Sequence, residues 1–215
     1  IAIPLGIYAG YKPESKTSKI IMGGSILGFS MPTFWVGIIF IMIFAVHLGW
    51  LPSTGRGEIG TFLGINSSLF TLNGLSHVFL PALNLALFKI SSVIRLTRAG
   101  TREIILQDYI TFARSKGLSE KRIVLVHILK NILIPIVTVV GLEFGSLIAF
   151  STVTETVFAW PGMGKLIIDS IYNLDRPVIV AYLMIIVTFF VFLNLIVDIL
   201  YTFLDPRVRI KGDSQ

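Results

Sequence analysis

Two long stretches without a charged side chain restrict the fold of this chain more than any other feature. Residues 20–46 form a run of 27 such residues, and residues 177–197 form a run of 21. At about 1.5 Å per residue, either run can cross the roughly 30 Å hydrocarbon core of a bilayer as a helix. Lipid offers no hydrogen bonds to a peptide backbone, so only helices and closed barrels span it. Continuous apolar runs without strand alternation favour helices.

The composition agrees with a membrane environment. The chain has 215 residues, of which 54% are hydrophobic and 14% are charged, and its mean hydropathy is +0.84. Cysteine is absent, which excludes disulfides, thiolate nucleophiles and cysteine metal sites. The net charge of +6 would suit nucleic acid, but the basic residues flank the apolar runs. We therefore expect them to orient the chain in the membrane and expect no nucleic-acid partner.

These runs predict an all-α, polytopic transmembrane helical bundle that forms one domain over residues 1–215. The first ten residues are apolar and lack an initiator Met, but at roughly 15 Å they would cross only half a bilayer. We interpret them as the end of a truncated span, so that about five spans are expected, the first one partial. Full spans are expected at about residues 20–46, 76–97, 131–154 and 177–204. Pro32, Pro81 and Pro135 fall inside or near the starts of these spans, where they are expected to free backbone carbonyls and bend the helices.

Lysine and arginine are distributed unequally between alternate loops. Of the 18 basic residues, 14 lie in residues 11–19, 95–130 and 205–215, and only three lie in residues 49–75 and 155–176. Basic residues near the ends of spans are retained in the cytoplasm. The first three segments, and with them the C-terminus, are therefore predicted to be cytoplasmic, and the other two segments external.

Two segments resemble enzyme motifs, but neither has the residues and structural context that the motif requires. Residues 55–60 match the dinucleotide fingerprint as letters but follow a membrane span rather than a strand. Residues 159–166 approach a phosphate-binding loop, yet Leu166 stands where Ser or Thr should hold magnesium. The three histidines lie in different regions, and no Ser, His and Asp set shares one side and depth of the bilayer. We expect no catalytic and no metal site.

A polar stripe marks one face of the span at 76–97. At 100° per residue, its members fall within about 60° of one another. They are a candidate lining of a translocation path, and hydrogen bonding between helices explains them equally well. Lys89 points about 140° away from the stripe and is expected to snorkel to the cytoplasmic interface. The stripe contains His77, Asn84, Ser91 and Arg95, followed by Arg98.

The span at 131–154 combines a small-residue face with one acid. Gly141, Gly145 and Ala149 recur every four residues and permit close helix approach. Glu143 lies on another face, where it needs a partner or must stay protonated. An ion-coupled secondary transporter is the alternative function, but it should show an internal repeat and clustered intramembrane acids, and neither is evident.

An amphipathic, basic segment follows the stripe, within a cytoplasmic loop at about residues 99–130. Over residues 101–117, apolar side chains oppose charged ones in a helical pattern. Gly117 is expected to end this helix, and Ser119 to cap a second one that starts near Glu120. A helix lying on anionic lipid is the alternative, but it leaves the Gly-Leu-Ser break unexplained.

The loop resembles the permease subunits of peptide-class ATP-binding-cassette importers, the dipeptide, oligopeptide, glutathione and nickel group. The segment Ala113–Glu120, A-R-S-K-G-L-S-E, is followed by Asn131, Pro135, Val137 and Thr138 in the peptide-class order. Of the wider superfamily pattern E-A-A-x3-G-x9-I-x-L-P, only Ala113 and Gly117 are literally present, and the proline comes five residues late. Further matches are Ser30–Trp35, Gly49–Pro52, Glu155 to Gly164 in the pattern E-x-V-F-x-W-P-G-x-G, and Asp198 to Arg207 in the pattern D-x2-Y-x3-D-P-R.

The resemblance covers essentially the whole chain and implies a type I importer permease of the bacterial inner (cytoplasmic) membrane, without its first span. It implies a second homologous permease subunit, two cytoplasmic ATPase subunits and a periplasmic or lipid-anchored solute-binding protein, with membrane lipid around them. This chain would bind no cofactor, because ATP and Mg are expected on the ATPases. The cargo, a peptide or a related small solute, is not identified by the resemblance.

The resemblance also implies that the loop couples the permease to its ATPase during alternating access. Tyr109 and Phe112 would be apolar anchors in a groove of the ATPase, because buried aromatic side chains dominate small interfaces. Arg114, Lys116 and Arg122 would add charge complementarity. The expected coupling residues are Asp108, Tyr109, Phe112, Ala113, Arg114, Lys116, Gly117, Leu118, Ser119 and Arg122.

Overall fold

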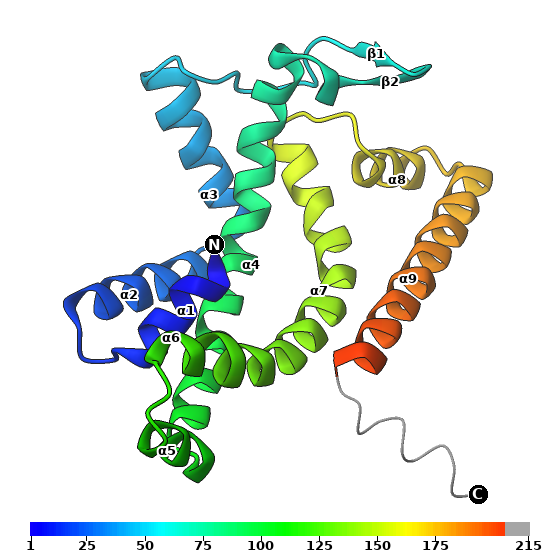
Figure 1. Ribbon diagram of the computed structural model, residues 1–215. Coiled ribbons are helices and arrows are strands. Elements are labelled where there is room, and N and C mark those ends of the chain that lie inside the picture. The colour runs from blue at the N-terminus through cyan, green and yellow to red at the C-terminus, as the bar shows by residue number, and fades with distance from the viewer. Residues whose placement is uncertain (205–215) are drawn as a thin grey trace, which may run out of the picture. The chain divides into compact units, whose positions relative to one another are not determined.

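The computed structural model describes residues 1–204, without the side chains of residues 142, 144, 149 and 201–204 (Figure 1). The predicted cytoplasmic segment 205–215 lies outside this range. It includes the final D-P-R of the pattern D-x2-Y-x3-D-P-R. The described part is mostly helical, as expected. Its elements are α1 (Ala2–Tyr11), α2 (Lys16–Ser30), α3 (Thr33–Phe40), η1 (Ile41–His47), β1 (Gly60–Phe62), β2 (Ile65–Ser67), η2 (Ser68–Phe70), α4 (Leu72–Ile105), α5 (Asp108–Ser115), α6 (Glu120–Arg122), η3 (Ile123–Ile128), α7 (Leu129–Val157), α8 (Met163–Tyr172) and α9 (Arg176–Leu204).

Contacts divide the chain into two compact units. Unit 1 comprises Ile1–Phe29, Lys89–Phe144 and the chain from Phe190 onward. Unit 2 comprises Ser30–Phe88 and Gly145–Phe189. The long helices α4, α7 and α9 each contribute one part to each unit.

Three helices within residues 1–204 are long and apolar enough to cross a membrane. They are Leu72–Ile105, Glu120–Ile148 and Arg176–Leu200. Each contains most of a span predicted from the sequence, which confirms a polytopic helical membrane protein. The apolar first segment forms α1, which has only ten residues.

The span predicted at residues 20–46 consists of two helices, Lys16–Ser30 and Thr33–His47, which meet at a bend of 107°. Helix α2 ends at Ser30, and α3 begins at Thr33 after Pro32, whose backbone is extended with ψ 133°. Proline has no N–H to donate, and it disfavours the helical conformation in the residue before it. Residues 41–47 then continue α3 as a π-helical turn. Only if the two helices are taken together do they make a fourth membrane-crossing segment.

The core of unit 1 is a cluster of buried aliphatic side chains that joins α5 and η3 to α7. Side chains of α1, among them Ile3 and Ile7, pack against the same cluster. Each fully buried isoleucine stabilises such a core by about 1.5–3 kcal/mol relative to exposure to water. The loop is therefore fixed to the helices beside it. The cluster consists of Ile110, Ala113, Ile123, Ile128, Ile132 and Ile136.

Helix α1 packs closely on the end of α4 in unit 1. A Cβ atom at Gly6 would lie 2.5 Å from Cβ of Thr97, and one at Gly10 would lie 2.6 Å from Cβ of Thr101. Gly6-x3-Gly10 thus acts as a small-residue face of the kind that membrane helices use. The face predicted at Gly141 agrees with the structure, since a Cβ there would lie 2.7 Å from Cγ2 of Val197 on α9.

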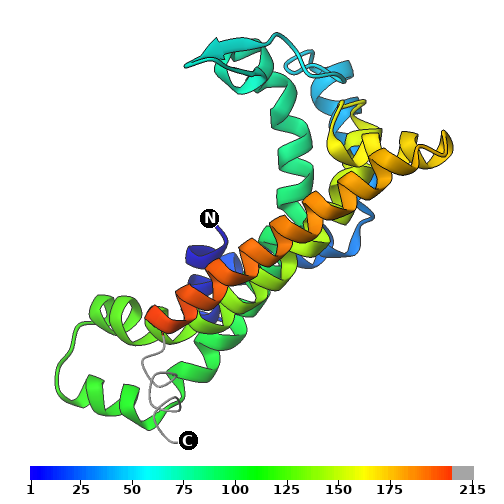
Figure 2. The ribbon, with the colours of Figure 1, turned by 90° about the vertical axis from the view of Figure 1, so that its right-hand side faces the viewer.

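Unit 2 packs α3 against the first part of α4 and the last part of α7. Val36, Leu80 and Phe158 are buried there. A Cβ atom at Gly37 would lie 3.2 Å from the Phe158 ring. A short antiparallel hairpin, β1 with β2, pairs Thr61 with Asn66 and precedes α4, as Figure 2 shows. The hairpin differs from the loop expected at residues 49–75.

Candidate functional site

The loop predicted to be cytoplasmic lies in unit 1, where the short helix α5 is followed by a glycine turn and then by the start of the long helix Glu120–Ile148 (Figure 2). The N–H of Gly117 donates to the carbonyl of Arg114 at 2.9 Å, and the N–H of Leu118 donates to that of Ala113 at 3.2 Å. This pair of bonds is a Schellman motif with Gly117 at its left-handed position, where φ is 78°. The prediction that Gly117 ends the amphipathic helix is confirmed, but that helix begins at Asp108, because residues 101–105 belong to α4.

Ser119 occupies the N-cap position of α6, as predicted, but its side chain makes no capping hydrogen bond. Its carbonyl oxygen accepts from the N–H of Arg122 at 2.9 Å and from that of Ile123 at 3.1 Å. The backbone alone therefore starts the second helix. The exposed side chain of Arg122 lies in this first turn.

The end of α1 is tied to the turn by side chains that the sequence analysis did not connect. The hydroxyl of Tyr11 donates to the carboxylate of Glu120, and Nε of Arg114 donates to Oε1 of Glu120 at 3.1 Å. The hydrogen bond with Tyr11, and to a lesser extent the one with Glu120, raises the pKa of Arg114. Burial, followed by the bond to Glu120, raises the pKa of Tyr11. Both charged groups are open to solvent, so water and salt screen their ion pair and it adds little to stability.

Helix α5 has two apolar sides. Ile110 and Ala113 face the core of unit 1, so Ala113 offers no surface to a partner. Phe112 is 59% exposed, and Leu106 in the preceding turn is 81% exposed. The ammonium group of Lys116 lies 4.4 Å from the centroid of the Phe112 ring. Leu106 was absent from the predicted set, although it stands three residues before Tyr109 and six before Phe112.

Tyr109 connects this exposed surface to α7. It is 42% exposed, and its hydroxyl accepts a hydrogen bond from Nδ2 of Asn131 at 3.2 Å. Its ring centroid is 6.4 Å from that of His127. The two separate parts of the family motif, the loop and the N-x3-P segment, thus meet here. A cavity of about 300 Å³ beside Tyr109 is lined by Gly100, Glu103, Ile104, Gln107, Tyr109, Asn131, Ile132 and Pro135.

The expectation that Lys89 snorkels to the interface is wrong. Its ammonium group pairs with the carboxylate of Glu143 on α7, in unit 1. The two side chains are 16% and 27% exposed. An ionisable side chain at mid-helix costs roughly 2.5–3.5 kcal/mol on insertion scales, so the pairing offsets part of that cost. Glu143 was expected to need a partner or to stay protonated, and Lys89 is that partner.

The residues of the polar stripe have different surroundings. Asn84 is 2% exposed, and its Nδ2 donates to Oγ1 of Thr154 at 3.2 Å in unit 2, which is the interhelical alternative. Nδ1 of His77 donates to the carbonyl of Asn73 at 2.8 Å. In unit 1, Ser91 is buried, and the guanidinium carbon of Arg95 lies 3.8 Å from the centroid of the Phe29 ring. Their role in a translocation path stays a prediction.

The E-x-V-F-x-W-P-G-x-G segment of unit 2 is organised by Glu155 at the end of α7. Its Oε2 accepts from the N–H of Lys165 at 2.8 Å, in the first turn of α8. A Cβ at Gly162 would lie 2.3 Å from the carboxyl carbon, so only glycine leaves room for this acid. The backbone carbonyl of Glu155 accepts a hydrogen bond from the N–H of Trp160 at 2.8 Å.

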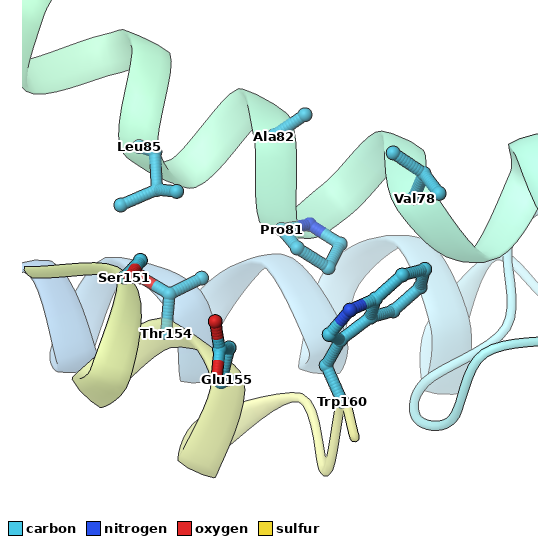
Figure 3. Close-up of a pocket in the computed structure, with 8 residues that line it drawn as sticks. All are labelled: Val78, Pro81, Ala82, Leu85, Ser151, Thr154, Glu155 and Trp160. Atoms are coloured by element: carbon cyan, nitrogen blue, oxygen red, sulfur yellow. The ribbon is translucent and has the colours of Figure 1, made fainter. Parts of the chain in front are cut away.

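Two cavities of unit 2 share Trp160 as a wall. One, of about 240 Å³, lies between the start of α4 and the end of α7 (Figure 3). Its lining residues are Val78, Pro81, Ala82, Leu85, Ser151, Thr154, Glu155 and Trp160. The other, of about 530 Å³, is lined by Arg56, Trp160, Pro161, Gly162, Met163, Lys165, Leu166 and Asp169. The sequence analysis assigned no binding role to either set.

Comparison with known proteins finds permeases of the kind that the motifs indicated. The di/tripeptide transport system permease protein of Pseudomonas aeruginosa (strain UCBPP-PA14) is 40% identical over 95% of this chain, which spans 64% of that protein. The dipeptide transport system permease protein of Escherichia coli (strain K12) is 35% identical over 98% of the chain and 67% of its own length. The oligopeptide transport system permease protein of Bacillus subtilis (strain 168) is 40% identical over 97% of the chain and 64% of its own length.

The match extends to a family model over nearly the whole length. Residues 2–210 match the model described as "binding-protein-dependent transport system inner membrane component". The resemblance stated from the loop and proline motifs is thereby confirmed. The chain belongs to the family of binding-protein-dependent transport system inner membrane components.

Proposed function

We propose that this chain belongs to the membrane-spanning permease subunit of an ATP-driven importer that carries peptides across a bacterial inner membrane. The names of relatives that are 35% to 40% identical support the peptide class. These relatives give no support to the ion-coupled alternative. The observation that carries the proposal is the surface of α5, where apolar side chains point outward from a helix whose other side is fixed in a core.

The coupling surface consists of Leu106, Tyr109 and Phe112, all exposed. We infer that it fits a groove of a cytoplasmic ATPase subunit, because aromatic anchors at the centre of an interface supply most of its binding energy. Asp108, Lys116 and Arg122, which are also exposed, would surround these anchors and adjust charge complementarity. Arg114 has a smaller part, because it pairs with Glu120 within the chain.

The attachment of α5 allows a pull on this surface to reach the membrane helices. Ile110 and Ala113 pack in one cluster with Ile132 and Ile136 of α7. The Schellman turn fixes the angle at which the chain leaves α5, and Tyr11 ties the turn to α1. When two ATPases close on ATP, α5 would move as a rigid lever, and the spans would change their access from one side of the membrane to the other. ATP and Mg would be bound by the ATPases.

The remaining partners and the orientation follow from the same proposal. A second homologous permease subunit would complete the path, and a periplasmic or lipid-anchored solute-binding protein would deliver peptide to the external loops. The C-terminus would lie in the cytoplasm with the coupling surface, as the distribution of lysine and arginine predicts. The subunit would not itself catalyse a reaction.

The absence of cysteine from this sequence makes a direct test possible. Single cysteines at Leu106 and Phe112 should crosslink to a cysteine in the groove of the ATPase within the assembled transporter. The matched control is Ala113→Cys, which places a side chain of similar size at a buried position of the same helix. An assembled, ATP-hydrolysing complex that gives no crosslink at Leu106 or Phe112 would contradict the coupling role.

A further inference from the structure

The cavity between the start of α4 and the end of α7 combines one acid with mostly apolar walls. Val78, Pro81, Ala82 and Leu85 of α4 form one side (Figure 3). Ser151, Thr154 and Glu155 of α7 form the other, with the indole of Trp160 beside them. All of these residues belong to unit 2.

The acid is held in position before any ligand arrives. Its Oε2 is bound by the N–H of Lys165, and Gly162 leaves the space in which the carboxyl group lies. Among residues 1–204, no lysine, arginine or histidine side chain forms an ion pair with Glu155. The cavity therefore holds a carboxylate that no basic side chain in its walls pairs with, and the bond to Lys165 reduces the cost of ordering this side chain when a ligand binds.

The lining selects a primary ammonium group next to an apolar side chain. A carboxylate forms strong, charge-assisted hydrogen bonds with an ammonium group, and an indole face attracts the same cation. The hydroxyl of Ser151 donates to the carbonyl of Ile148 at 2.8 Å, so its oxygen can still accept a hydrogen bond from a ligand. A lipid chain would leave the carboxylate facing hydrocarbon, which is costly. A calcium ion would require six or more oxygen ligands, more than these side chains supply.

The size of the cavity fits one amino-acid residue. Its volume of about 240 Å³ is many times the roughly 10–15 Å³ that a single water molecule requires, so it has room for a ligand of several heavy atoms. We propose that this cavity receives the amino-terminal residue of a transported peptide, with its ammonium group against Glu155 and Trp160 and its side chain against α4. This inference rests on the proposed function. The rest of the peptide would pass Trp160 into the second cavity, which is lined in part by Arg56 and Lys165.

The test uses the assembled transporter in nanodiscs, without its solute-binding protein, and with 5-fluorotryptophan in place of tryptophan. The ¹⁹F resonance of Trp160 is assigned by its loss in Trp160→Phe. Dialanine should shift this resonance saturably and leave those of Trp35 and Trp50 unchanged, because neither residue lines the cavity. N-acetyl-dialanine, which has no ammonium group, should bind at least about tenfold more weakly.

Substitution of the acid supplies the second measurement. Glu155→Gln keeps an oxygen to accept from the N–H of Lys165 but removes the charge, so the preference for dialanine over its acetylated form should disappear. Glu58→Gln removes a charge from an exposed residue that lines neither cavity, and it should keep the preference. Equal binding of the two peptides to the unsubstituted transporter, which requires no variant of Glu155, would overturn the assignment.

Failure of this inference can be told from failure of the proposed function. Uptake of dialanine driven by ATP is measured in proteoliposomes with the solute-binding protein present. Normal uptake together with equal binding of both peptides rejects only the cavity assignment. Absence of ATP-driven uptake of any peptide by the complete, unsubstituted transporter rejects the peptide-importer proposal itself.

Discussion

Lys89 of α4 and Glu143 of α7 form an ion pair within unit 1, and each lies on a helix apolar enough to cross a membrane. Each side chain alone would oppose insertion of its helix into lipid. Together they present a neutral, hydrogen-bonded contact that holds the two helices in register. This pair is the basis of the first prediction.

Lys89→Glu and Glu143→Lys should each destabilise the subunit by about 2–4 kcal/mol, because each places two like charges together in a partly buried site. The double variant, Lys89→Glu with Glu143→Lys, restores opposite charges and should recover at least half of the loss. Thermal unfolding of the purified complex measures both effects. Additive losses in the double variant would show that the two side chains do not interact.

Gly6→Ala should destabilise the packing of α1 on α4 by about 1–3 kcal/mol, because the new methyl group would overlap Thr97. The matched control is Gly23→Ala in α2, where no atom lies within 4 Å of the added Cβ. There the loss of glycine flexibility should stabilise the helix by up to about 1 kcal/mol. Melting temperatures that change in the same direction for both variants would contradict the close contact.

Gly117→Ala should cost about 1–2 kcal/mol, because alanine is strained at a φ of 78°. No neighbouring atom opposes a Cβ at Gly117, so the cost comes from the backbone alone. Asparagine tolerates the left-handed conformation better, and Gly117→Asn should lose less stability. Stability is measured by chemical unfolding, and peptide-stimulated ATP hydrolysis should fall in the same order. If Gly117→Ala is more stable than Gly117→Asn, the result argues against the Schellman turn.

Phe112→Ala should weaken binding of the ATPase subunit by about 2 kcal/mol, roughly a thirtyfold loss of affinity, if Phe112 is a central anchor. Thr111→Ala is the matched control, because it is an exposed neighbour on the same helix with little apolar area. It should change affinity less than about threefold. Surface-immobilised ATPase and solubilised permease give both values. Equal effects of the two substitutions would place the anchor elsewhere.

The sequence predicted features that depend on one segment at a time. Charge-free length identified the spans that begin near residues 20 and 177, and a glycine after an amphipathic segment identified the turn at Gly117. The bend at Pro32 was predicted by the same kind of reasoning, because a proline within an apolar run has no N–H to extend the helix. Its angle of 107° depends on packing that the sequence does not show.

Features that depend on two helices could not be read in the same way. The pair of Lys89 with Glu143 requires the relative rotation of α4 and α7, which the periodicity of either helix alone does not give. Gly6-x3-Gly10 was visible as a spacing, but its partners Thr97 and Thr101 are about 90 residues away in the chain. The binding of Glu155 to the start of α8 depends on a loop of irregular backbone, for which sequence has no period.

The attachment of α5 through Ile110 and Ala113 has a consequence for how such loops diverge between relatives. Dispersion contacts among aliphatic side chains have little directionality. Many sets of aliphatic residues of similar total volume can therefore pack α5 against α7 equally firmly. The exposed side of α5 can therefore change to fit a different ATPase subunit while the buried side remains packed against α7. A loop transplanted together with its aliphatic partners on α7 should retain its stiffness in a foreign permease.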